Sequence, residues 1–218
     1  MTDATLIVLA KAPVPGRVKT RLCPPCSPLD AAAIARAAIV DTLAAVTATP
    51  GVRPLLVLEG EPGEWVPDLI EVVPQVGGDL GARLTGAFGR SAGPAVLVGM
   101  DTPQVTPSTL RAAVDALLRP AVDAVLGQTL DGGWWIIGLR DPSLPAFDGV
   151  PMSTPETGRR QAARLARLGL RMRGLDLEMD VDTFADALTV ANRIPASQFA
   201  RAVYAVDHDL SVEGRVLA

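Results

Sequence analysis

Short apolar runs alternate along this chain with longer alanine-rich amphipathic stretches, and glycines and prolines separate the two kinds of segment. The first half of the pattern predicts strands at residues 6–10, 53–58, 70–73 and 95–99, and helices at 28–47, 80–91 and 107–118. Such alternation is typical of a mostly parallel sheet with helices on both faces. We therefore expect an α/β fold.

The pattern changes after residue 120, where two β-rich runs, 122–126 and 134–139, lie close together. Asp131, Gly132 and Gly133 form a turn signal between them, which predicts an antiparallel pair or a sharply bent crossover. A purely parallel pattern would have a helix there, so we expect a mixed sheet in which this pair builds one wall of a pocket. Further segments predict a helix at 155–168, a strand at 171–177 and helices at 183–192 and 196–204.

A chain of 218 residues with 49% apolar residues is long enough to bury a full core. Because it has no internal repeats and no obvious linker, we predict one domain over residues 1–218, with a frayed tail from 209 to 218. No apolar run approaches the roughly 20 residues of a membrane helix, and the first strand is too short for a signal peptide. We expect a cytoplasmic protein with no membrane partner; the sequence leaves its oligomeric state open.

Positive charge is distributed unevenly. The net charge is −4, which gives no general attraction to nucleic acid, so we expect no nucleic-acid partner. Yet the only two lysines, Lys11 and Lys19, share one loop with Arg17 and Arg21, and no acid occurs from residue 4 to 29. A basic loop is commonly just solvated. This one follows an apolar strand and leads into a helix, where α/β proteins bind phosphates.

This loop is not a Walker A motif, because no glycine-rich run precedes a Gly-Lys-Ser/Thr triplet. Lys11 and Lys19 are the leading candidates for phosphate contacts, and Gly16 allows a tight turn. Near Gly78 the chain lets a base or ribose approach, and Asp79 is either a helix cap or a partner for a sugar hydroxyl. The predicted nucleotide-binding residues are Leu9, Lys11, Gly16, Arg17, Lys19, Arg21, Gly78, Asp79 and Leu80.

Three carboxylates follow two of the predicted strands. Asp101 comes directly after residues 95–99, and Asp180 and Asp182 follow the late strand with a spacing that places both on one side of an extended segment. Asp101 has an alternative role in a turn, and Asp182 an alternative role as a helix cap. Combined with the basic loop, the three predict a site for Mg²⁺ or Mn²⁺ that bridges substrate phosphates.

The two cysteines, Cys23 and Cys26, have a spacing used by redox pairs and by half of many zinc sites. Zinc would need two more ligands, and His208 is the only histidine. The helix start at Ser27 could lower the pKa of Cys26, but a thioredoxin-like context is missing, which favours a structural role.

Six segments in order resemble a bacterial glycosyltransferase-like family of unknown function with the GT-A, or nucleotide-diphospho-sugar transferase, fold. The resemblance extends to about residue 194 and lies at residues 11–22, 78–81, 99–103, 131–139, 152–154 and 180–183. It implies that an acceptor binds near Gly132, Gly133, Trp134, Ser153 and Thr154. The chain departs from the family pattern at Trp134 and Trp135, where tyrosines are commoner, and at Met152, where a tryptophan is expected.

More distantly, the chain is similar to phospholactate and phosphoenolpyruvate guanylyltransferases. The shared features are residues 19–22, an aspartate with a proline two residues later at Asp101, and the segment 180–183. In those enzymes the aspartates serve the metal site, which by resemblance implies Asp101, Asp180 and Asp182.

These features favour a metal-dependent nucleotidyltransferase that transfers a nucleoside monophosphate from a nucleoside triphosphate to a small anionic acceptor and releases pyrophosphate. Lys19, Arg17 and Asp101 are its predicted catalytic residues. The alternative is a GT-A glycosyltransferase with a nucleotide-sugar donor, in which a hydroxyl acceptor attacks the anomeric carbon. A third hypothesis is a non-catalytic nucleotide-binding protein that has kept the fold.

Overall fold

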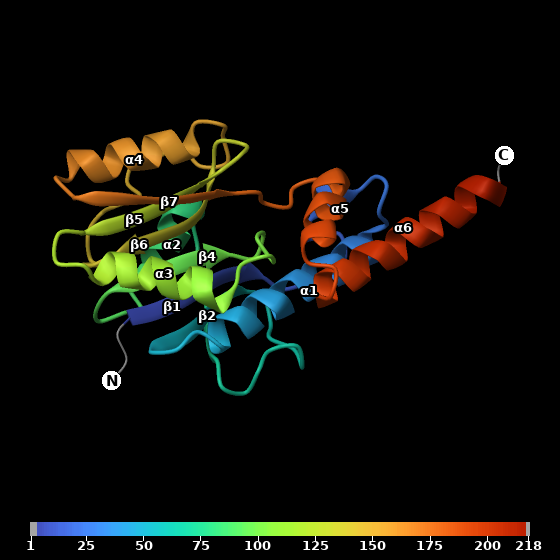
Figure 1. Ribbon diagram of the computed structural model, residues 1–218, viewed down its shortest axis with the longest axis horizontal. Coiled ribbons are helices and arrows are strands. Elements are labelled where there is room, and N and C mark those ends of the chain that lie inside the picture. Colours follow the sequence, from blue (N-terminus) through green and yellow to red (C-terminus); the bar gives the residue numbers. More distant parts are fainter. Residues whose placement is uncertain (1–3, 217–218) are drawn as a thin grey trace.

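The computed structural model describes residues 4–216, with side chains up to residue 212. In chain order its elements are β1 (Ala4–Lys11), η1 (Thr20–Leu22), α1 (Pro28–Thr47), β2 (Val52–Glu59), β3 (Glu71–Pro74), α2 (Leu80–Phe88), β4 (Ala95–Gly99), α3 (Pro107–Leu118), β5 (Ala124–Thr129), β6 (Trp134–Leu139), α4 (Thr157–Arg167), β7 (Met172–Glu178), α5 (Phe184–Arg193) and α6 (Gln198–Val216). The strands form one sheet in the order β3-β2-β1-β4-β6-β5-β7 (Figure 1). This arrangement confirms the predicted α/β fold.

The sheet is mixed in the way the sequence predicts. Strands β1, β2, β3 and β4 are mutually parallel, whereas β6 runs antiparallel to both β4 and β5. At the edge of the sheet β7 is parallel to β5, with Thr129 paired with Glu178. The carboxyl ends of β1, β4, β5 and β7 and the amino end of β6 therefore share one edge of the sheet.

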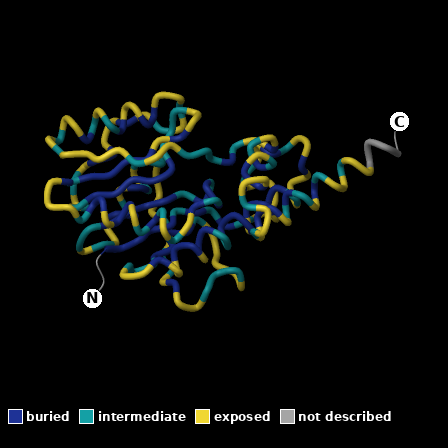
Figure 2. The backbone as a smooth tube through the Cα atoms, in the orientation of Figure 1, coloured by how far each residue is buried: buried dark blue, intermediate teal, exposed yellow. Residues whose placement is uncertain are grey.

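Helices cover both faces because the inner strands are apolar on both sides. Leu6 and Val8 of β1 pack in one cluster with α1 and α3, and Ile7 between them packs in another with α2 and α4. Adjacent residues of a strand point to opposite faces, which explains why the strand is a continuous apolar run. Figure 2 shows the inner strands buried along most of their length, whereas the edge strand β7 is largely exposed.

A third apolar cluster lies outside the two faces of the sheet. The first half of α1 packs there with α5 and α6, and the cluster also contains Leu22 and Val181. Figure 1 shows α5 and α6 standing beside one end of the sheet, where β7 continues into α5. The cluster thus joins the basic loop to the segment after β7.

The fraying of the tail from residue 209 stays a prediction. Helix α6 runs to Val216, and its exposure increases towards residue 212 (Figure 2). Val206 is buried, whereas Val212 is 46% exposed. The final two residues of the predicted tail, 217 and 218, lie outside the described residues.

Helix caps explain where the helices near the sheet edge begin. Ser27 and Asp30 form a capping box at α1, and Thr183 and Asp186 form another at α5. Asp79 caps α2 through a hydrogen bond from the backbone N–H of Ala82, as the capping alternative predicts. Because Thr183 is the cap of α5, the alternative role of Asp182 as a cap is wrong.

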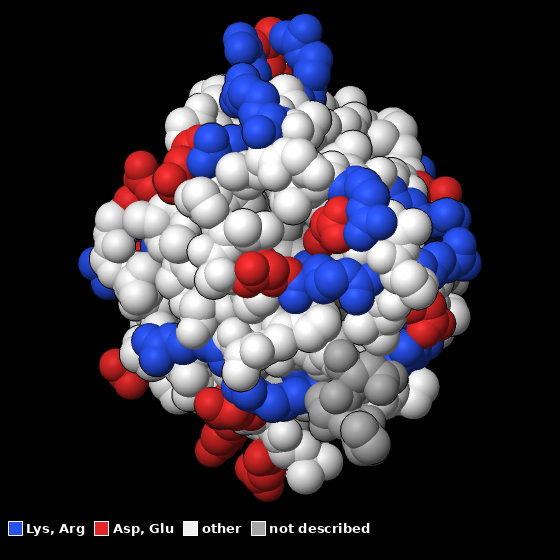
Figure 3. All heavy atoms as spheres, turned by 90° about the vertical axis from the view of Figure 1, so that its left-hand side faces the viewer, with Lys and Arg blue, Asp and Glu red and all other residues white. Residues whose placement is uncertain are grey.

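The surface carries charges of both signs. On the face shown in Figure 3, basic and acidic side chains are interspersed, and the described residues there form no continuous basic patch. No helix in residues 4–216 has the length and apolarity needed to cross a bilayer. The absence of a nucleic-acid partner stays a prediction.

A close backbone contact fixes the β5–β6 turn. Gly132 has φ of +92°, and a Cβ added there would lie 2.0 Å from the carbonyl oxygen of Pro155. The carbonyl oxygen of Gly132 in turn accepts a hydrogen bond of 2.8 Å from the backbone N–H of Gly158 in α4. Only glycine allows both the conformation and this approach, so the turn is held against the start of α4.

We expect Gly132→Ala to lower the free energy of unfolding by about 3 kcal/mol or more, from backbone strain and overpacking together. Gly149→Ala is the matched control, because Gly149 also has positive φ, +69°, but its Cβ would meet nothing within 4 Å. That control should lose only about 1 kcal/mol. Urea unfolding measures both, and equal losses would contradict the importance of the Pro155 contact.

Candidate active site

A cavity of about 560 Å³ opens at the sheet edge where β1, β4 and β5 end. Four carboxylates line it: Asp101 after β4, Asp131 in the β5–β6 turn, and Asp180 and Asp182 after β7. Part of its wall is apolar, formed by Leu9, Leu80, Leu84, Leu97, Trp134 and Met152. Arg21 is the cation among its lining residues, so the cavity has an excess of negative charge.

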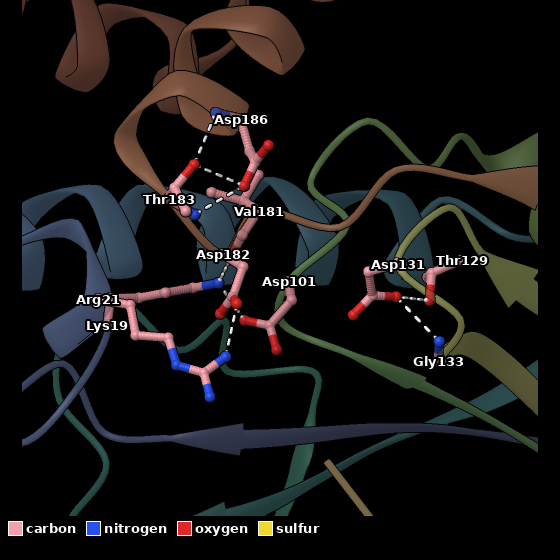
Figure 4. A network of polar contacts seen from close by, with 10 residues as sticks. All are labelled: Lys19, Arg21, Asp101, Thr129, Asp131, Gly133, Val181, Asp182, Thr183 and Asp186. Carbon is pink, nitrogen blue, oxygen red and sulfur yellow. Dashed lines mark hydrogen bonds and ion pairs between the residues drawn. The ribbon is translucent and has the colours of Figure 1, made fainter. Parts of the chain in front are cut away.

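Lys19 joins three distant segments behind this cavity. Its ammonium lies 2.5 Å from a carboxylate oxygen of Asp101 and donates to the carbonyl oxygen of Val181 (Figure 4). The backbone N–H of Val181 donates in turn to the carbonyl oxygen of Asp101, at 2.8 Å. The Lys19 side chain is only 9% exposed, so its charge is used within the protein. We call Lys19, Asp101 and Val181 the clamp.

The backbone of the basic loop is shaped to deliver this side chain. Lys19 has φ of 48° and ψ of 38°, the left-handed region, and it directly precedes η1. A lysine there is uncommon, because its Cβ crowds the following carbonyl. Leu22, three residues later, is fully buried in the third apolar cluster and anchors the loop.

The other cations of the loop have separate positions. Arg21 lies 2.5 Å from a carboxylate oxygen of Asp182, and its side chain is 71% exposed. Lys11 is paired with Glu59 at 3.1 Å, and Arg83 holds the second oxygen of Glu59 at 2.7 Å. Arg17 is exposed on the loop. Among the basic side chains Lys11, Arg17, Arg21 and Arg83, only that of Arg21 lines the cavity.

The surroundings of Asp180 shift the pKa of its side chain. Burial, assisted by the nearby charges of Asp131 and Asp101 and opposed by Lys19, raises this pKa from 3.8 to about 6. Burial and like charges both disfavour the ionised form. The carboxylates of the cavity therefore repel one another, and a bound cation would relieve this repulsion.

Asp131 is held by its own turn. Its Oδ1 accepts hydrogen bonds from the Thr129 hydroxyl at 2.5 Å and from the backbone N–H of Gly133 at 2.9 Å. Figure 4 shows its other carboxylate oxygen pointing from the turn towards Asp101. Unlike Asp101 and Asp182, Asp131 forms no ion pair with a described residue.

The structure brings many of the predicted site residues to this cavity. Those that line it are Leu9, Arg21, Leu80, Asp101, Gly133, Trp134, Ser153, Thr154, Asp180 and Asp182. Those outside its lining are Lys11, Gly16, Arg17, Lys19, Gly78, Asp79 and Gly132. Lys19 and Lys11, the leading candidates for phosphate contacts, are both occupied by carboxylates in this structure.

Several residues of the cavity were not predicted as site residues. Asp131 is the most important, because the sequence marks it as part of a turn signal and of a segment shared with the family but does not single it out as a site residue. The observation that identified Asp101, an acid directly after an apolar strand, applies equally to Asp131 after β5. Thr102, Thr129 and Thr157 add hydroxyls to the lining, and no pattern in the sequence singles them out.

The metal site remains a prediction. In the part of the chain that the structure describes, no group of three or more histidine, cysteine, aspartate or glutamate side chains is arranged to hold a metal ion. Asp101 and Asp182 are instead turned to cations of the basic loop. Mg²⁺ does not require such a cage, because one or two carboxylates together with substrate phosphates and water commonly hold it.

The surroundings of Cys26 disfavour the thiolate, which is the reactive form of a cysteine. Burial, with contributions from Cys23 and Asp30, raises the pKa of its thiol to about 11, so the expected lowering by the helix start is wrong. Ser27 and Asp30 satisfy that helix start between themselves. Cys26 packs in the third apolar cluster, as a structural residue does.

Residues 37–154, more than half of the chain, match the model of a family described as uncharacterised proteins conserved in bacteria, DUF2064. The chain belongs to the DUF2064 family. The predicted resemblance to a bacterial family of unknown function is thereby confirmed. A comparison with curated proteins gave no match.

Solved structures share the fold of this DUF2064 protein. A protein from Desulfovibrio desulfuricans G20, provisionally named a nucleotide-diphospho-sugar transferase, is 26% identical with a TM-score of 0.82, over 97% of this chain and 96% of that one. CMP:2-keto-3-deoxy-manno-octonic acid synthetase, complexed with CTP, is 13% identical with a TM-score of 0.57, over 88% and 98%. A cytidylyltransferase from Leptospira borgpetersenii is 12% identical with a TM-score of 0.56, over 97% of each chain. The nucleotide-diphospho-sugar transferase fold is thus confirmed.

We expect Lys19→Met to lower the free energy of unfolding by about 2 kcal/mol, because it leaves the carbonyl of Val181 without its donor and Asp101 without its cation. The loss stays below that of a fully buried pair, since the Asp101 side chain is 50% exposed. Lys11→Met is the control, because both partners in its ion pair are more than 40% exposed, and it should cost less than about 1 kcal/mol. Urea unfolding compares the two, and equal losses would contradict the clamp.

We expect Asp180→Asn to stabilise the metal-free protein at pH 7 by about 1 to 2 kcal/mol, after allowance for partial exposure. The pKa of Asp180 is about 6 in the folded protein against 3.8 unfolded, so ionisation between those values favours the unfolded chain. The advantage should shrink at pH 5 and vanish below about pH 4. Unfolding in EDTA at each pH tests this, and a constant difference would rule out the titration of Asp180 as its cause.

Proposed function

We propose that this DUF2064 protein is a metal-dependent nucleotidyltransferase, which transfers a nucleoside monophosphate from a nucleoside triphosphate to an acceptor and releases pyrophosphate. The observation that carries the proposal is the cavity at the carboxyl ends of β1, β4 and β5, with four carboxylates and a basic loop along one side. A site in that position of an α/β sheet is where nucleotides commonly bind. Phosphoryl-type transfer needs its charges neutralised more than it needs covalent chemistry from the protein.

The charges of the cavity support a role for a divalent cation. A triphosphate would meet Asp101, Asp131, Asp180 and Asp182, which repel it, and Arg21, which attracts it. Asp101 and Asp180 would hold Mg²⁺ or Mn²⁺ together with the phosphates. Asp182, the ion-pair partner of Arg21, would be a further carboxylate ligand of the same cation. When bound, the ion would neutralise charge on the transferred and leaving groups.

The basic loop would serve this site in two ways. Arg21 has an exposed guanidinium at the cavity, which can turn from Asp182 to a phosphate oxygen once a cation has taken over the carboxylate. Lys19 would keep Asp101 in place from behind, as a positioning residue. Arg17, exposed on the same loop, would add to the attraction of the triphosphate.

A glycosyl transfer is the second candidate. The provisional name of the Desulfovibrio protein, which matches with a TM-score of 0.82, favours it. The CTP complex of the synthetase and the cytidylyltransferase from Leptospira favour nucleotidyl transfer. Both reactions need the same cation and differ in the bond that breaks, so the product distinguishes them: pyrophosphate in one case and a nucleoside diphosphate in the other.

The test is thermal unfolding with each of the four common nucleoside triphosphates and with nucleotide sugars, with and without Mg²⁺. A ligand at 100 times its dissociation constant stabilises a protein by about 2.7 kcal/mol, which raises the melting temperature by several degrees. We expect one triphosphate to do so only with Mg²⁺, and Asp101→Asn to remove the shift. Asp148→Asn, which changes an acid outside the cavity, serves as the control. Stabilisation by nucleotide sugars alone would replace the proposal with glycosyl transfer.

A further inference from the structure

The cations near the cavity are already engaged, which constrains the acceptor. Lys19 is shielded from solvent by its contacts with Asp101 and Val181, and Arg21 is paired with Asp182. The sequence predicts a small anionic acceptor. Such an anion would join a triphosphate in a cavity lined by four carboxylates and one arginine. The charge distribution therefore favours an acceptor without negative charge.

The wall around the β5–β6 turn is polar but uncharged apart from Asp131. Ser153 and Thr154 contribute hydroxyls to the same cavity, whereas the hydroxyl of Thr157 already donates to the carbonyl oxygen of Pro151. Trp134 also lines the cavity, but its indole N–H is buried without a hydrogen-bond partner among the described residues. Hydroxyl groups such as those of Ser153 and Thr154 recognise hydroxylated compounds through hydrogen bonds.

Asp131 differs from the other three carboxylates of the cavity. Its Oδ1 is fixed by the Thr129 hydroxyl and by the backbone N–H of Gly133, which orients the carboxylate plane. The opposite oxygen points away from the turn towards Asp101 (Figure 4). Asp101 and Asp182 each hold a cation, whereas Asp131 forms no ion pair with a described residue. It is also exposed enough for a substrate to reach it.

We propose that the acceptor is a neutral hydroxyl compound and that Asp131 takes its proton; this inference rests on the proposed nucleotidyl transfer. The hydroxyl proton passes to the free carboxylate oxygen of Asp131. The hydroxyl oxygen forms a bond to the α-phosphorus, and the bond from that phosphorus to the bridging oxygen breaks. Pyrophosphate leaves with the electron pair, and Asp131 later returns the proton to water. Proton transfer to a positioned side chain of this kind contributes about 100-fold to 10,000-fold in rate.

Water is itself a neutral hydroxyl acceptor, so the first assay needs no knowledge of the natural one. With the triphosphate that stabilises the protein and Mg²⁺, we expect slow release of nucleoside monophosphate and pyrophosphate. Asp131→Asn should lower kcat by about 100-fold or more without weakening the binding of the triphosphate or lowering the melting temperature, because it removes a charge that repels both the triphosphate and Asp180. A purely structural role for Asp131 would weaken binding or lower the melting temperature.

Matched acceptors test the charge preference. Glycerol is compared with glycerol 3-phosphate, and glucose with glucose 6-phosphate, by release of pyrophosphate. We expect the neutral member of each pair to raise the rate above that with water. Faster turnover with the phosphorylated members would overturn the inference, as would an unchanged rate in Asp131→Asn.

Two further variants separate the possible failures. Asp148→Asn makes the same chemical change in an acid outside the cavity and should leave the rate unaltered. Thr129→Val removes one of the two hydrogen bonds to Asp131 and should reduce kcat less than Asp131→Asn does. If no triphosphate binds, or none is cleaved to a monophosphate, the proposed function itself fails. If cleavage occurs but does not depend on Asp131, the inference alone fails.

Discussion

The site depends on hydrogen bonds formed by the backbone N–H and C=O groups of Val181. Val181 donates its N–H to the carbonyl of Asp101 and accepts the ammonium of Lys19, and Lys19 completes the triangle by its ion pair with Asp101. The basic loop, the end of β4 and the segment after β7 are thereby fixed to one another. Asp180 and Asp182 flank Val181, so the clamp also sets where these two carboxylates stand. Apolar packing of Leu22 and Val181 in one cluster supports the same junction.

The charges around the cavity are only partly balanced by ion pairs. Each cation of the basic loop that lies close to the cavity already has a carboxylate partner, and the remaining acids, Asp131 and Asp180, repel each other. This arrangement is stable without a ligand but retains unbalanced negative charge. A cation that brings its own phosphates would complete it, which connects the fold, the raised pKa of Asp180 and the proposed chemistry.

The sequence predicts the strand ends well, because apolar runs, glycines and prolines determine them locally. Asp101, Asp180 and Asp182 therefore come to one cavity as expected, as do Ser153 and Thr154, which the family resemblance implied. The direction of a side chain depends on contacts with residues that are distant in sequence. Lys11 pairs with Glu59 and Lys19 with Asp101, so neither lysine lines the cavity. Asp131 was not predicted as a site residue, because the turn signal and the family segment that contain it do not show that its carboxylate lines the cavity. The burial that raises the pKa of Cys26 likewise results from tertiary packing, which the spacing of the two cysteines in the sequence does not predict.

The clamp spans a large part of the chain, since Lys19 and Val181 are 162 positions apart in sequence. Chains are synthesised from the amino terminus, and their early parts begin to fold first. A nascent chain that ends before residue 180 already contains β1 to β7 but lacks Val181 and Asp182. In such a chain Lys19 still has Asp101 but lacks the carbonyl oxygen of Val181, and Arg21 lacks its partner Asp182. The segment that follows β7 therefore completes the clamp and fixes the basic loop only after the whole sheet has been synthesised.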